Sequence, residues 1–376
     1  MDTSMQVNHQ RQEHTASYYA ASANASANYP SLSSNETADV CIVGAGFTGI
    51  ATALTLAERG YRVVVLEANR VGWGASGRNG GQLINGVGGL SKIEKRHGSS
   101  VEDLVWDMRW RGNDIIRERV EKYAIDCDLK DGYAEVAVKP SQIEYINEAA
   151  EERERRNFQH RFEVWEQQET AERLGTNAFH GAFVCYRDGH LHPLNLCIGE
   201  ADAAVRQGTR IFEQSPAIDI ERGERPKVRT ERGSVTADAV VIAGNAYSQL
   251  EPAKLSNLVF PAGSYIIATE PLPEDIATEI NSADVAVCDL NEVVDYYRLS
   301  ADRRLLYGGA CNYSGRDPHD IEAYIRPRML RVYPQLSEVR VDYQWGGKIG
   351  IVLNRSVTVG RLHGDVYYCQ GYSGHG

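Results

Sequence analysis

The segment from Asp39 to Glu67 constrains the fold more than any other part of the sequence. It reads as a short apolar run, DVCIVG, a glycine turn, a helical pattern and a second apolar run, YRVVVLE. Apolar residues recur at helical spacing in FTGIATALTLAERG, and Gly60 is placed to end that helix. Strand, tight turn, helix and strand within about thirty residues predict a parallel βαβ unit with a right-handed crossover.

The turn in this unit carries a dinucleotide-binding pattern, because Gly44, Gly46 and Gly49 fit GxGxxG. The first glycine allows the tight turn, the second lets backbone approach a pyrophosphate, and the third lets the helix pack on the strand. Glu67 ends the second strand, where a carboxylate can accept hydrogen bonds from ribose hydroxyls. That carboxylate would repel a 2′-phosphate and so argues against NADP, whereas NAD and FAD both remain compatible.

A second glycine-rich segment, GWGASGRNGGQLINGVGG, lies between Gly72 and Gly89. Such a run does not suit an ordinary helix or strand, because glycine loses conformational entropy without supplying packing. An extended cofactor with a buried ring needs another stretch of backbone that can approach it closely. The segment therefore favours FAD over NAD.

Composition narrows the class of protein. With 376 residues, 42% of them apolar, the chain can bury a large core, and its net charge of -11 argues against binding nucleic acid or an anionic membrane. Residues 1–38 are polar and lack the apolar core of a secretory signal, and no run reaches the length of a membrane span. Seven scattered cysteines without a CxxC pair favour a reduced compartment over disulfides or a metal site. We expect a cytoplasmic protein; its oligomeric state is not visible in the sequence.

Two capping boxes predict helices after the second glycine-rich segment. Ser99 with Glu102 predicts a helix running to Tyr123, with Leu104 and Met108 among its inward-facing residues. Ser141 with Glu144 predicts a charged, solvent-facing helix. PLNLCIGEADAAVRQG predicts a further helix that ends at Gly208, followed by four short strands.

Hairpin and strand signals dominate the remaining sequence. Residues 126–139 predict a hairpin turned at Asp131 and Gly132, and YYRLSADRRLLYGG predicts a second one around residues 301–303. Asp317 and Pro318 predict the start of a helix to Tyr333. VRVDYQW, VTVG and DVYYCQ are typical of strands.

The stretch VLEANRVGWGASGRNGGQ resembles the FAD-dependent amine and amino-acid oxidase family, which includes D-amino-acid, glycine and sarcosine oxidases. EHTASYYAASAN, CDLKDG, GHLHPLNL, FEQSPAIDIERG, AGNAY, DYYRL and YPQL are similar to its γ-glutamylputrescine-oxidising group. The resemblance runs from about Glu13 to Gly376. It implies an α/β fold in which a Rossmann-like FAD-binding domain is interleaved with an α+β substrate domain built on a mixed antiparallel sheet.

We expect the chain to be divided accordingly. Residues 1–38 form an N-terminal arm in this division. Residues 39–125, 190–257 and 345–376 make the FAD-binding domain, and residues 126–189 and 258–344 make the substrate domain.

The resemblance implies a set of residues that hold FAD. They are Gly44, Gly46, Phe47, Thr48, Gly49, Glu67, Ala68, Ala75, Ser76, Arg78, Asn79, Gly80, Gly81, Ala217, Ala243, Gly244, Gly371, Ser373 and Gly374. Arg78 has the alternative of a purely structural surface arginine. Some relatives attach flavin through a cysteine in the strand where this chain has Trp345, Gly346 and Gly347. That difference implies noncovalent FAD.

The sequence given closes on GYSGHG, which resembles the loop beside the flavin ring in this family. In relatives a helix follows, and the amides of its N-terminus face the flavin atoms that gain negative charge on reduction. We therefore expect the sequence to be a truncated form of a longer chain. His375 could touch the flavin or cap the helix that follows in relatives.

The chemistry that the resemblance implies is the oxidation of an amine, γ-glutamylputrescine or a related polyamine adduct. A hydride passes from the carbon beside the nitrogen to flavin N5, water hydrolyses the imine to an aldehyde, and O2 reoxidises the flavin to give hydrogen peroxide. Two alternatives stay open. One is an amine or amino-acid dehydrogenase that uses a non-oxygen acceptor, and the other is a flavin-binding protein without turnover.

Five side chains are candidates for the reacting end of the site. Arg298 matches a basic residue that faces the flavin in sarcosine-oxidase relatives, where it would bind the substrate carboxylate or assist oxygen reduction; an exposed hairpin arginine is the alternative. Tyr297, with Tyr296, could form an aromatic wall around the amine, and His375 completes the catalytic set. His192 could line the pocket, or it could be a hydrogen-bonded residue flanking a helix.

Overall fold

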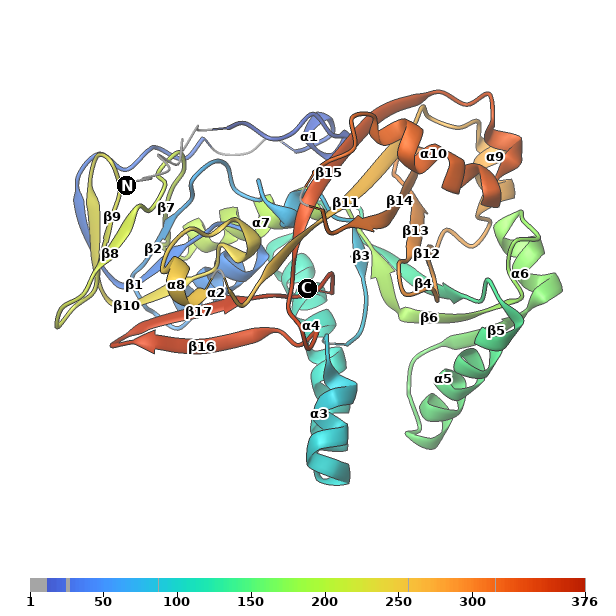
Figure 1. Cartoon of the computed structure of the whole chain (residues 1–376), viewed down its shortest axis with the longest axis horizontal. Helices are drawn as coiled ribbons and strands as arrows, with labels where there is room; N and C mark the ends of the chain where they lie inside the picture. The colour runs from blue at the N-terminus through green and yellow to red at the C-terminus, as the bar shows by residue number, and fades with distance from the viewer. Residues whose placement is uncertain (1–11, 25–27, 87, 256, 315, 376) are drawn as a thin grey trace.

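A computed structural model gives the structure of residues 12–24, 28–86, 88–255, 257–314 and 316–375. Two β-sheets form its frame, one on each side of Figure 1, and helices pack against both. The predicted α/β fold class is confirmed. No helix within the described residues is both long enough and apolar enough to cross a bilayer.

The helices are α1 (Tyr18–Ala21), α2 (Phe47–Glu58), α3 (Leu90–His97), α4 (Glu102–Tyr123), α5 (Ile143–Arg155), α6 (Gln167–Leu174), α7 (Pro193–Arg206), α8 (Pro252–Leu255), α9 (Glu274–Ile280) and α10 (Ile321–Val332). The strands are β1 (Asn35–Val43), β2 (Val63–Leu66), β3 (Gln82–Leu83), β4 (Lys130–Val136), β5 (Phe162–Glu166), β6 (Gly181–His190), β7 (Arg210–Phe212), β8 (Asp219–Glu221), β9 (Lys227–Arg229), β10 (Ser234–Ile242), β11 (Phe260–Thr269), β12 (Ala286–Asp289), β13 (Asp295–Leu299), β14 (Leu305–Asn312), β15 (Val341–Ile351), β16 (Thr358–His363) and β17 (Val366–Gln370).

The first sheet contains the predicted βαβ unit. Its strands β17, β10, β1, β2 and β7 pair in parallel in that order, and β16 joins antiparallel to β17. All four residues of β2 are buried, as expected for a parallel strand covered on both faces. On one face α2 packs against α7, where Ala53, Ala201 and Ala204 let the helices approach closely. This packing fixes the glycine turn at the start of α2.

The second sheet has the order β15-β11-β14-β13-β12-β4-β6-β3, with β5 also paired to β6. Its neighbouring strands are antiparallel except β12 and β4. One face packs against α6, α9 and α10 around the largest core cluster of the described residues. The other face meets α7, since Leu194 and Ile198 pack with Ile266, Leu306 and Trp345. Successive residues of each strand therefore point either to the outer core or toward the first sheet.

The predicted hairpin over residues 126–139 is wrong. Residues 130–136 form the single strand β4, which pairs antiparallel with β6 and parallel with β12. Gly132 has a φ of 108° at an irregularity in the β6 pairing, and a Cβ on it would lie 2.5 Å from Val285 Cγ1. The Asp-Gly pair therefore marks a bulge within a strand, which has the same local signature as a turn.

Three predicted helices are present, but their capping residues differ. α4 follows a 3₁₀ turn and has Val101 as its N-cap, so no side chain caps it. Before α5, the side chain of Gln142 accepts hydrogen bonds from the amides of Val138 and Lys139, in place of the predicted Ser141 box. α10 starts after Asp320, whose carboxylate accepts from the amide of Ala323, so the predicted start at Asp317 is three residues early.

The inward face predicted for α4 is wrong in the first half of the helix, whereas Val120, which the same spacing places inward, packs on a core cluster. Leu104 and Met108 are exposed, whereas Val105 and Trp110 are buried together with Asn113. The helical period was read from the apolar residues alone. The buried polar residue shifts the inward face away from Leu104 and Met108.

Two segment boundaries of the predicted domains disagree with the sheets. The boundary at residue 345 falls inside β15, which pairs with β11 of the second sheet along its length. β3, assigned to the FAD-binding segment 39–125, pairs with β6 of the same second sheet. Gly346 and Gly347 lie within this strand, and a Cβ at Gly346 would lie 2.7 Å from the ring of Tyr265 on the paired strand β11. The two-domain division remains a proposal with these boundaries moved.

The predicted N-terminal arm is docked where the structure describes it. Residues 12–24 lie over the upper edge of the molecule in Figure 1, crossing from the first sheet to the second, and α1 lies within them. Leu32 is buried in the core of the first sheet. Residues 1–11 and 25–27 of the arm lie outside the described part.

Candidate functional site

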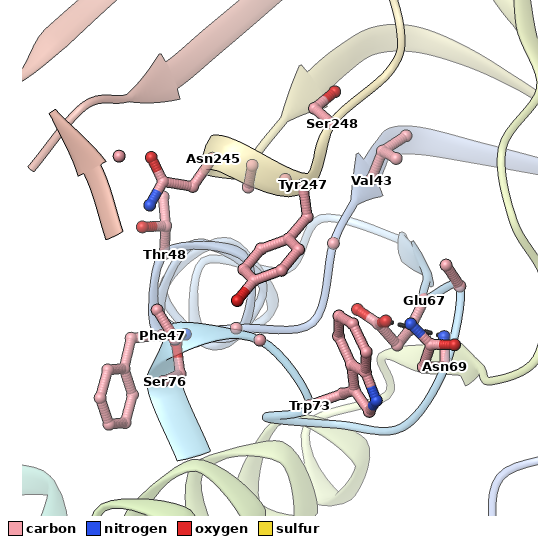
Figure 2. Close-up of a pocket in the computed structure, with 18 of the residues that line it drawn as sticks. Val43, Phe47, Thr48, Glu67, Asn69, Trp73, Ser76, Asn245, Tyr247 and Ser248 are labelled. Atoms are coloured by element: carbon pink, nitrogen blue, oxygen red, sulfur yellow. Dashed lines mark hydrogen bonds between the residues drawn. The ribbon is translucent and has the colours of Figure 1, made fainter. Parts of the chain in front are cut away.

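A cavity of about 360 Å³ opens at the carboxyl ends of the parallel strands β1, β2 and β10. Parallel sheets bind ligands at this end, and the volume lies in the range of small-molecule pockets. Figure 2 shows side chains from the glycine turn, the loop after β2 and the loop after β10 converging on it. The cavity therefore takes its walls from segments far apart in the sequence.

The glycine turn forms the floor of the cavity in a conformation that requires glycine. Gly44 has a φ of 108°, and a Cβ on it would lie 2.9 Å from the carbonyl oxygen of Ala243. A Cβ on Gly49 would lie 1.8 Å from the carbonyl oxygen of Gly44, so the third glycine lets α2 pack on the turn. A Cβ on Gly46 would lie 2.8 Å from Ser76 Oγ. Gly44 and Gly49 are sterically required because their neighbours are backbone atoms, whereas the neighbour of Gly46 is a side chain.

The N-terminus of α2 faces this cavity. Gly46 is the N-cap residue, no described side chain caps it, and the first turn carries no acidic residue. The amide of Phe47 donates to Ser76 Oγ at 2.9 Å, which joins the two glycine-rich segments. A helix N-terminus with amides toward the cavity and no competing carboxylate suits a bound phosphate.

Glu67 lies at the end of β2, as predicted, and lines the cavity. Its carboxylate accepts hydrogen bonds from the amides of Ala45 at 2.7 Å and Asn69 at 2.8 Å. Burial raises the pKa of Glu67, and these amides oppose that rise. A carboxylate has about four acceptor positions, so the backbone amides leave acceptor capacity for a hydroxyl group of a ligand.

An aromatic wall closes one side of the cavity and was missed by the sequence analysis. The rings of Trp73 and Tyr247 meet edge to face with centroids 5.3 Å apart, as Figure 2 shows. The guanidinium of Arg78 lies 4.2 Å from the centroid of the Trp73 ring and donates to the Trp73 carbonyl. Burial lowers the pKa of Arg78. Arg78 is therefore a packed, half-buried residue beside the cavity.

Asn79 braces the second glycine-rich segment. Its amide group donates to the carbonyls of Ala75 and Ser76, and its oxygen accepts from the amide of Gly81 at 2.8 Å. The turn that follows packs on β13, since a Cβ on Gly80 would lie 2.7 Å from the ring of Tyr296. Gly80 and Gly81 therefore lie beside the cavity residues, against the second sheet.

Arg298 holds this turn and does not face an open pocket. It is 1% exposed, and its guanidinium donates to the carbonyls of Gly80 at 3.1 Å and Leu299 at 3.1 Å. A third bond, at 3.3 Å, goes to the hydroxyl of Tyr19. Three of its five donors are therefore directed at protein atoms. The alternative of an exposed arginine is wrong, and the catalytic role of Arg298 stays a prediction.

Tyr297 points to the other face of β13. Its ring stacks on Tyr307 at 5.5 Å, and its hydroxyl is 3.0 Å from that of Tyr333. These partners belong to the outer core of the second sheet. Strand alternation therefore places Tyr296, not Tyr297, toward the glycine turn, and the catalytic role of Tyr297 stays a prediction.

The GYSGHG loop is held against both glycine segments. The Tyr372 hydroxyl is hydrogen-bonded to Thr48 Oγ1 in the first turn of α2. The amide of Ser373 donates to the carbonyl of Gly350 at 2.8 Å, and the amide of Gly371 donates to Asn245 Oδ1 at 3.0 Å. The loop thus joins α2, β15 and the end of β10.

Two histidines differ in their availability to a ligand. His375 Nε2 is buried and has no hydrogen-bond partner among the described residues, and burial lowers the pKa of His375. His192 is the N-cap of α7: its Nδ1 accepts from the amide of Asn195, and its Nε2 lies 3.1 Å from Ser22 Oγ. The helix-flanking alternative for His192 is confirmed. His375 Nε2 has no partner within hydrogen-bond geometry among the described residues, while the backbone of Asn85 and Gly86 beside the ring opposes the lowering of its pKa.

The predicted cofactor residues divide into two groups. Those that line the cavity are Gly44, Gly46, Phe47, Thr48, Glu67, Ala68, Ala75, Ser76, Asn79, Ala217, Ala243, Gly244 and Gly374. Gly49, Arg78, Gly80, Gly81, Gly371 and Ser373 instead support or adjoin its walls. The sequence analysis missed Asn69, Trp73, Tyr247, Tyr372 and Gly350 as lining residues. Trp73 and Tyr372 lie inside the quoted glycine-rich motifs, which is the signal that could have identified them.

The cavity fits the dinucleotide half of FAD. It has a glycine cradle that a single Cβ would fill, a helix N-terminus for the pyrophosphate and a carboxylate with free acceptor positions for ribose hydroxyls. Each of these three features is a recognition element for a different part of a dinucleotide.

Comparisons with known proteins agree with this reading. A family model described as FAD dependent oxidoreductase matches residues 39–376. The γ-glutamylputrescine oxidoreductase of Escherichia coli strain K12 is 44% identical over 367 residues, which cover 97% of this chain and 86% of that protein. A probable oxidoreductase of Haemophilus influenzae is 41% identical over 376 residues, 98% of this chain and 86% of the relative.

Solved structures share the fold. An L-proline dehydrogenase from P. horikoshii aligns with a TM-score of 0.74 at 19% identity, over 91% of this chain and 90% of that one. A glycine oxidase from Geobacillus kaustophilus aligns with a TM-score of 0.73 at 22% identity, over 90% of each chain. With a family model that spans most of the sequence and two relatives above 40% identity, this chain belongs to the FAD-dependent oxidoreductase family.

Proposed function

We propose that this enzyme oxidises the terminal amine of γ-glutamylputrescine or a closely related polyamine adduct, with noncovalent FAD and with O2 as the final acceptor, in the cytoplasm. The observation that carries the substrate is the 44% identity to the E. coli enzyme of that name, which extends over 97% of the chain. The negative net charge of -11 suits a substrate that bears ammonium groups.

Bound FAD supplies the two-electron acceptor for the amine, and the protein supplies binding, orientation and electrostatics. We propose that all nineteen predicted cofactor residues contribute, thirteen as cavity lining and six as support. Glu67 would hold the ribose hydroxyls, and the N-terminus of α2 would face the pyrophosphate. Gly80 and Gly81 would bring backbone close to the ring system.

The reacting amine must lose its proton before it can be oxidised. An alkyl ammonium has a pKa of about 10.4, so the neutral form at pH 7 costs about 4.6 kcal/mol at about 1.36 kcal/mol per pKa unit. The ring of Tyr296, packed over Gly80, would desolvate the ammonium and lower its pKa. Arg298 lies two residues after Tyr296 in β13, and its buried positive charge would also lower the pKa of the ammonium.

His375 remains the catalytic candidate. Its Nε2 has no hydrogen-bond partner in the described structure, and the lowered pKa keeps the ring neutral at pH 7. A neutral ring nitrogen can accept a hydrogen bond from the substrate nitrogen without adding positive charge. We propose that His375 orients the amine in this way.

An anaerobic flavin-reduction experiment tests the substrate. The purified holoenzyme is mixed with γ-glutamylputrescine, putrescine or glycine in a stopped-flow spectrometer, and the visible flavin absorbance is followed. We expect fast bleaching with γ-glutamylputrescine and slow or no bleaching with the other two amines. Fast bleaching by glycine, without bleaching by γ-glutamylputrescine, would contradict the assignment.

A second measurement separates oxidase from dehydrogenase activity. The reduced enzyme is exposed to air, and hydrogen peroxide is measured against aldehyde formed. One peroxide per aldehyde supports an oxidase. Aldehyde formation that requires an added quinone, with little peroxide, would overturn the proposed role of O2 and leave the substrate assignment in place.

A further inference from the structure

Residues 12–24, called here the N-terminal strap, contact both halves of the site. The strap begins beside the loop after β2, where the amide of Gln12 donates to Asn69 Oδ1 at 2.9 Å. It ends at the start of α7, where the amide of Asn24 donates to Asn195 Oδ1 at 2.9 Å. Asn69 lines the cavity, so the strap begins at its wall.

The first strap contact fixes the aromatic wall. Glu13 forms two hydrogen bonds of 2.8 Å with the guanidinium of Arg70, and its carbonyl accepts from the indole nitrogen of Trp73 at 3.0 Å. Arg70 also pairs with the buried carboxylate of Glu213. The indole ring that lines the cavity is therefore held from outside by the strap.

The second strap contact is made by a fully buried tyrosine. Tyr19 is 0% exposed and packs edge to face on Trp345 and His192, with ring centroids 5.3 and 4.9 Å apart. Its hydroxyl accepts a hydrogen bond from Arg298, whose Nε donates to the carbonyl of Gly80. A chain of two hydrogen bonds thus runs from the strap to the glycine turn beside the cavity.

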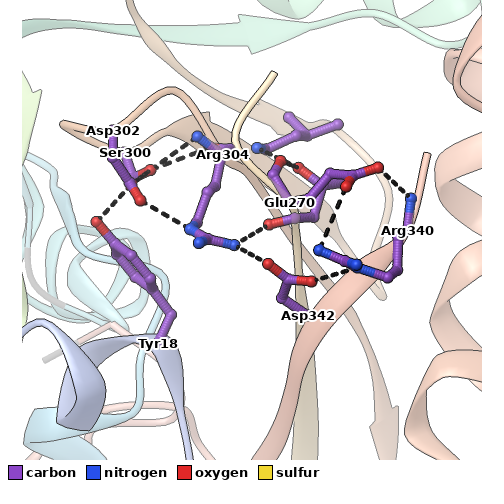
Figure 3. Close-up of polar contacts among 9 residues, drawn as sticks. Tyr18, Glu270, Ser300, Asp302, Arg304, Arg340 and Asp342 are labelled. Atoms are coloured by element: carbon purple, nitrogen blue, oxygen red, sulfur yellow. Dashed lines mark hydrogen bonds and ion pairs between the residues drawn. The ribbon is translucent and has the colours of Figure 1, made fainter. Parts of the chain in front are cut away.

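An ion-pair network anchors the strap between these contacts. The hydroxyl of Tyr18 donates to Asp302 at 2.8 Å, and Asp302 pairs with Arg304 at 2.8 Å. Arg304 continues to Asp342, which also pairs with Arg340, as Figure 3 shows. Because Asp302 lies in the β13–β14 connection and Asp342 in β15, the network fixes α1 on the second sheet while residues 12 and 13 are fixed on the first.

We propose that the N-terminal strap is part of the FAD site, with Tyr19 as a positioning residue that acts through Arg298 on the Gly80–Gly81 turn. The proposal rests on FAD binding, which family membership establishes, and not on the identity of the amine. Loss of the Tyr19 hydroxyl leaves one donor of a buried guanidinium unsatisfied, and the guanidinium then shifts relative to Gly80. The turn moves with it.

The test compares single tyrosine-to-phenylalanine variants of the holoenzyme. Tyr19→Phe should weaken FAD binding about tenfold, as expected for one hydrogen bond to a buried charge, and should shift the visible flavin spectrum. Tyr29→Phe, outside the strap, removes a bond to Asp202 on α7. This control should keep the wild-type FAD dissociation constant and spectrum.

A double-mutant cycle shows whether Tyr19 acts through Arg298. FAD dissociation constants and flavin spectra are measured for Tyr19→Phe, Arg298→Lys and the double variant. Non-additive effects support the proposal: in the Arg298→Lys background, Tyr19→Phe should hardly change the FAD dissociation constant or the spectrum. Additive effects, an unchanged dissociation constant and spectrum in Tyr19→Phe, or equal losses in Tyr19→Phe and Tyr29→Phe would overturn it. If Tyr19→Phe does not fold, Tyr19→Leu, which also lacks the acceptor oxygen, takes its place in the cycle. None of these readouts depends on amine turnover, so the inference can fail while the proposed function stands.

Discussion

The two sheets build their parts of the site in different ways. Around the first sheet, the cavity is formed by backbone: Gly44, Gly46 and Gly49 bring main chain together, and Glu67 is held by amides. On the second sheet, the outcome depends on which face of a strand each side chain occupies, as Tyr296 and Tyr297 show. A site formed by backbone depends on residues that are close together in the sequence. A site formed by side chains on one face of a strand depends on packing partners that are far away in the sequence.

The strongest test of the backbone site is Gly49→Ala. Its methyl group would collide with the carbonyl oxygen of Gly44, and we expect a loss of about 3 kcal/mol in the free energy of unfolding together with colourless purified protein. Urea unfolding and the visible flavin spectrum measure the two effects. Gly112→Ala is the control, since a Cβ there has no neighbour within 4 Å and should stabilise α4 by about 0.5–1 kcal/mol. A yellow, stable Gly49→Ala variant would break the contrast between the sheets.

A smaller effect is expected at a buried side-chain anchor on β6 of the second sheet, Asp188. Its carboxylate is buried and accepts from the amide of Asn85 at 2.7 Å, from the Asn85 side chain at 2.6 Å and from Asn113 at 3.1 Å. Asp188→Asn would set an amide donor against these donors and should cost about 2 kcal/mol in urea unfolding. Asp131→Asn, at an exposed ion pair, should change stability by less than about 0.5 kcal/mol. Equal costs at both positions would contradict the anchoring role.

His192 gives a pH-dependent test of the packing under the strap. Burial, aided by Arg298, lowers the pKa of His192 to about 4 in the folded protein, whereas the unfolded value is about 6.5. Between these values the unfolded state binds more protons, so folding stability contributed by neutral His192 falls as the pH drops from about 6.5 to 4. His192→Asn retains a capping side chain and should be about 1 kcal/mol less stable than wild type at pH 8.

The stability gap between His192→Asn and wild type should change by about 1 kcal/mol per pH unit below pH 6.5, so that it closes near about pH 5.5 and reverses sign at lower pH. Urea unfolding at several pH values measures the gap, and other titrating groups cancel in the difference. A gap that stays constant from pH 8 to pH 4.5 would show that His192 is not buried in its neutral form.

The smallest effect is expected at Tyr297. Tyr297→Phe removes the hydroxyl contact to Tyr333 in the outer core and should lower the free energy of unfolding by about 1 kcal/mol. Both kcat/KM and the flavin spectrum should be unchanged, because the residue faces away from the glycine turn. A large fall in kcat with normal stability would restore Tyr297 to the site and erase the distinction between the faces of β13.

The features that the sequence predicted are those that depend on local pattern, and the features that it missed depend on distant packing partners. The βαβ unit, α2 with its end at Gly60, α7 and the hairpin of β13 and β14 were all predicted, since each depends on local pattern. The Asp131–Gly132 turn failed because a bulge and a turn share residues, and only pairing with β6 and β12 decides between them. The burial of Arg298 was not predicted, for a related reason.

The partner that turns Arg298 inward is Tyr19, which lies 279 positions away in the sequence. No local pattern could reveal that contact. The aromatic wall of Trp73 and Tyr247 was missed in the same way, because the two rings come from different loops.

The long strand β15 connects the second sheet to the loop that carries His375. β15 is paired with β11 throughout the second sheet, and at its far end Gly350 accepts a hydrogen bond from the loop that carries His375. A paired strand resists bending at one end alone, so a disturbance of the cofactor loop would be transmitted as a loss of pairing far from it. The rate of amide hydrogen exchange along residues 346–351 should therefore report how firmly the cofactor loop is held on the second sheet.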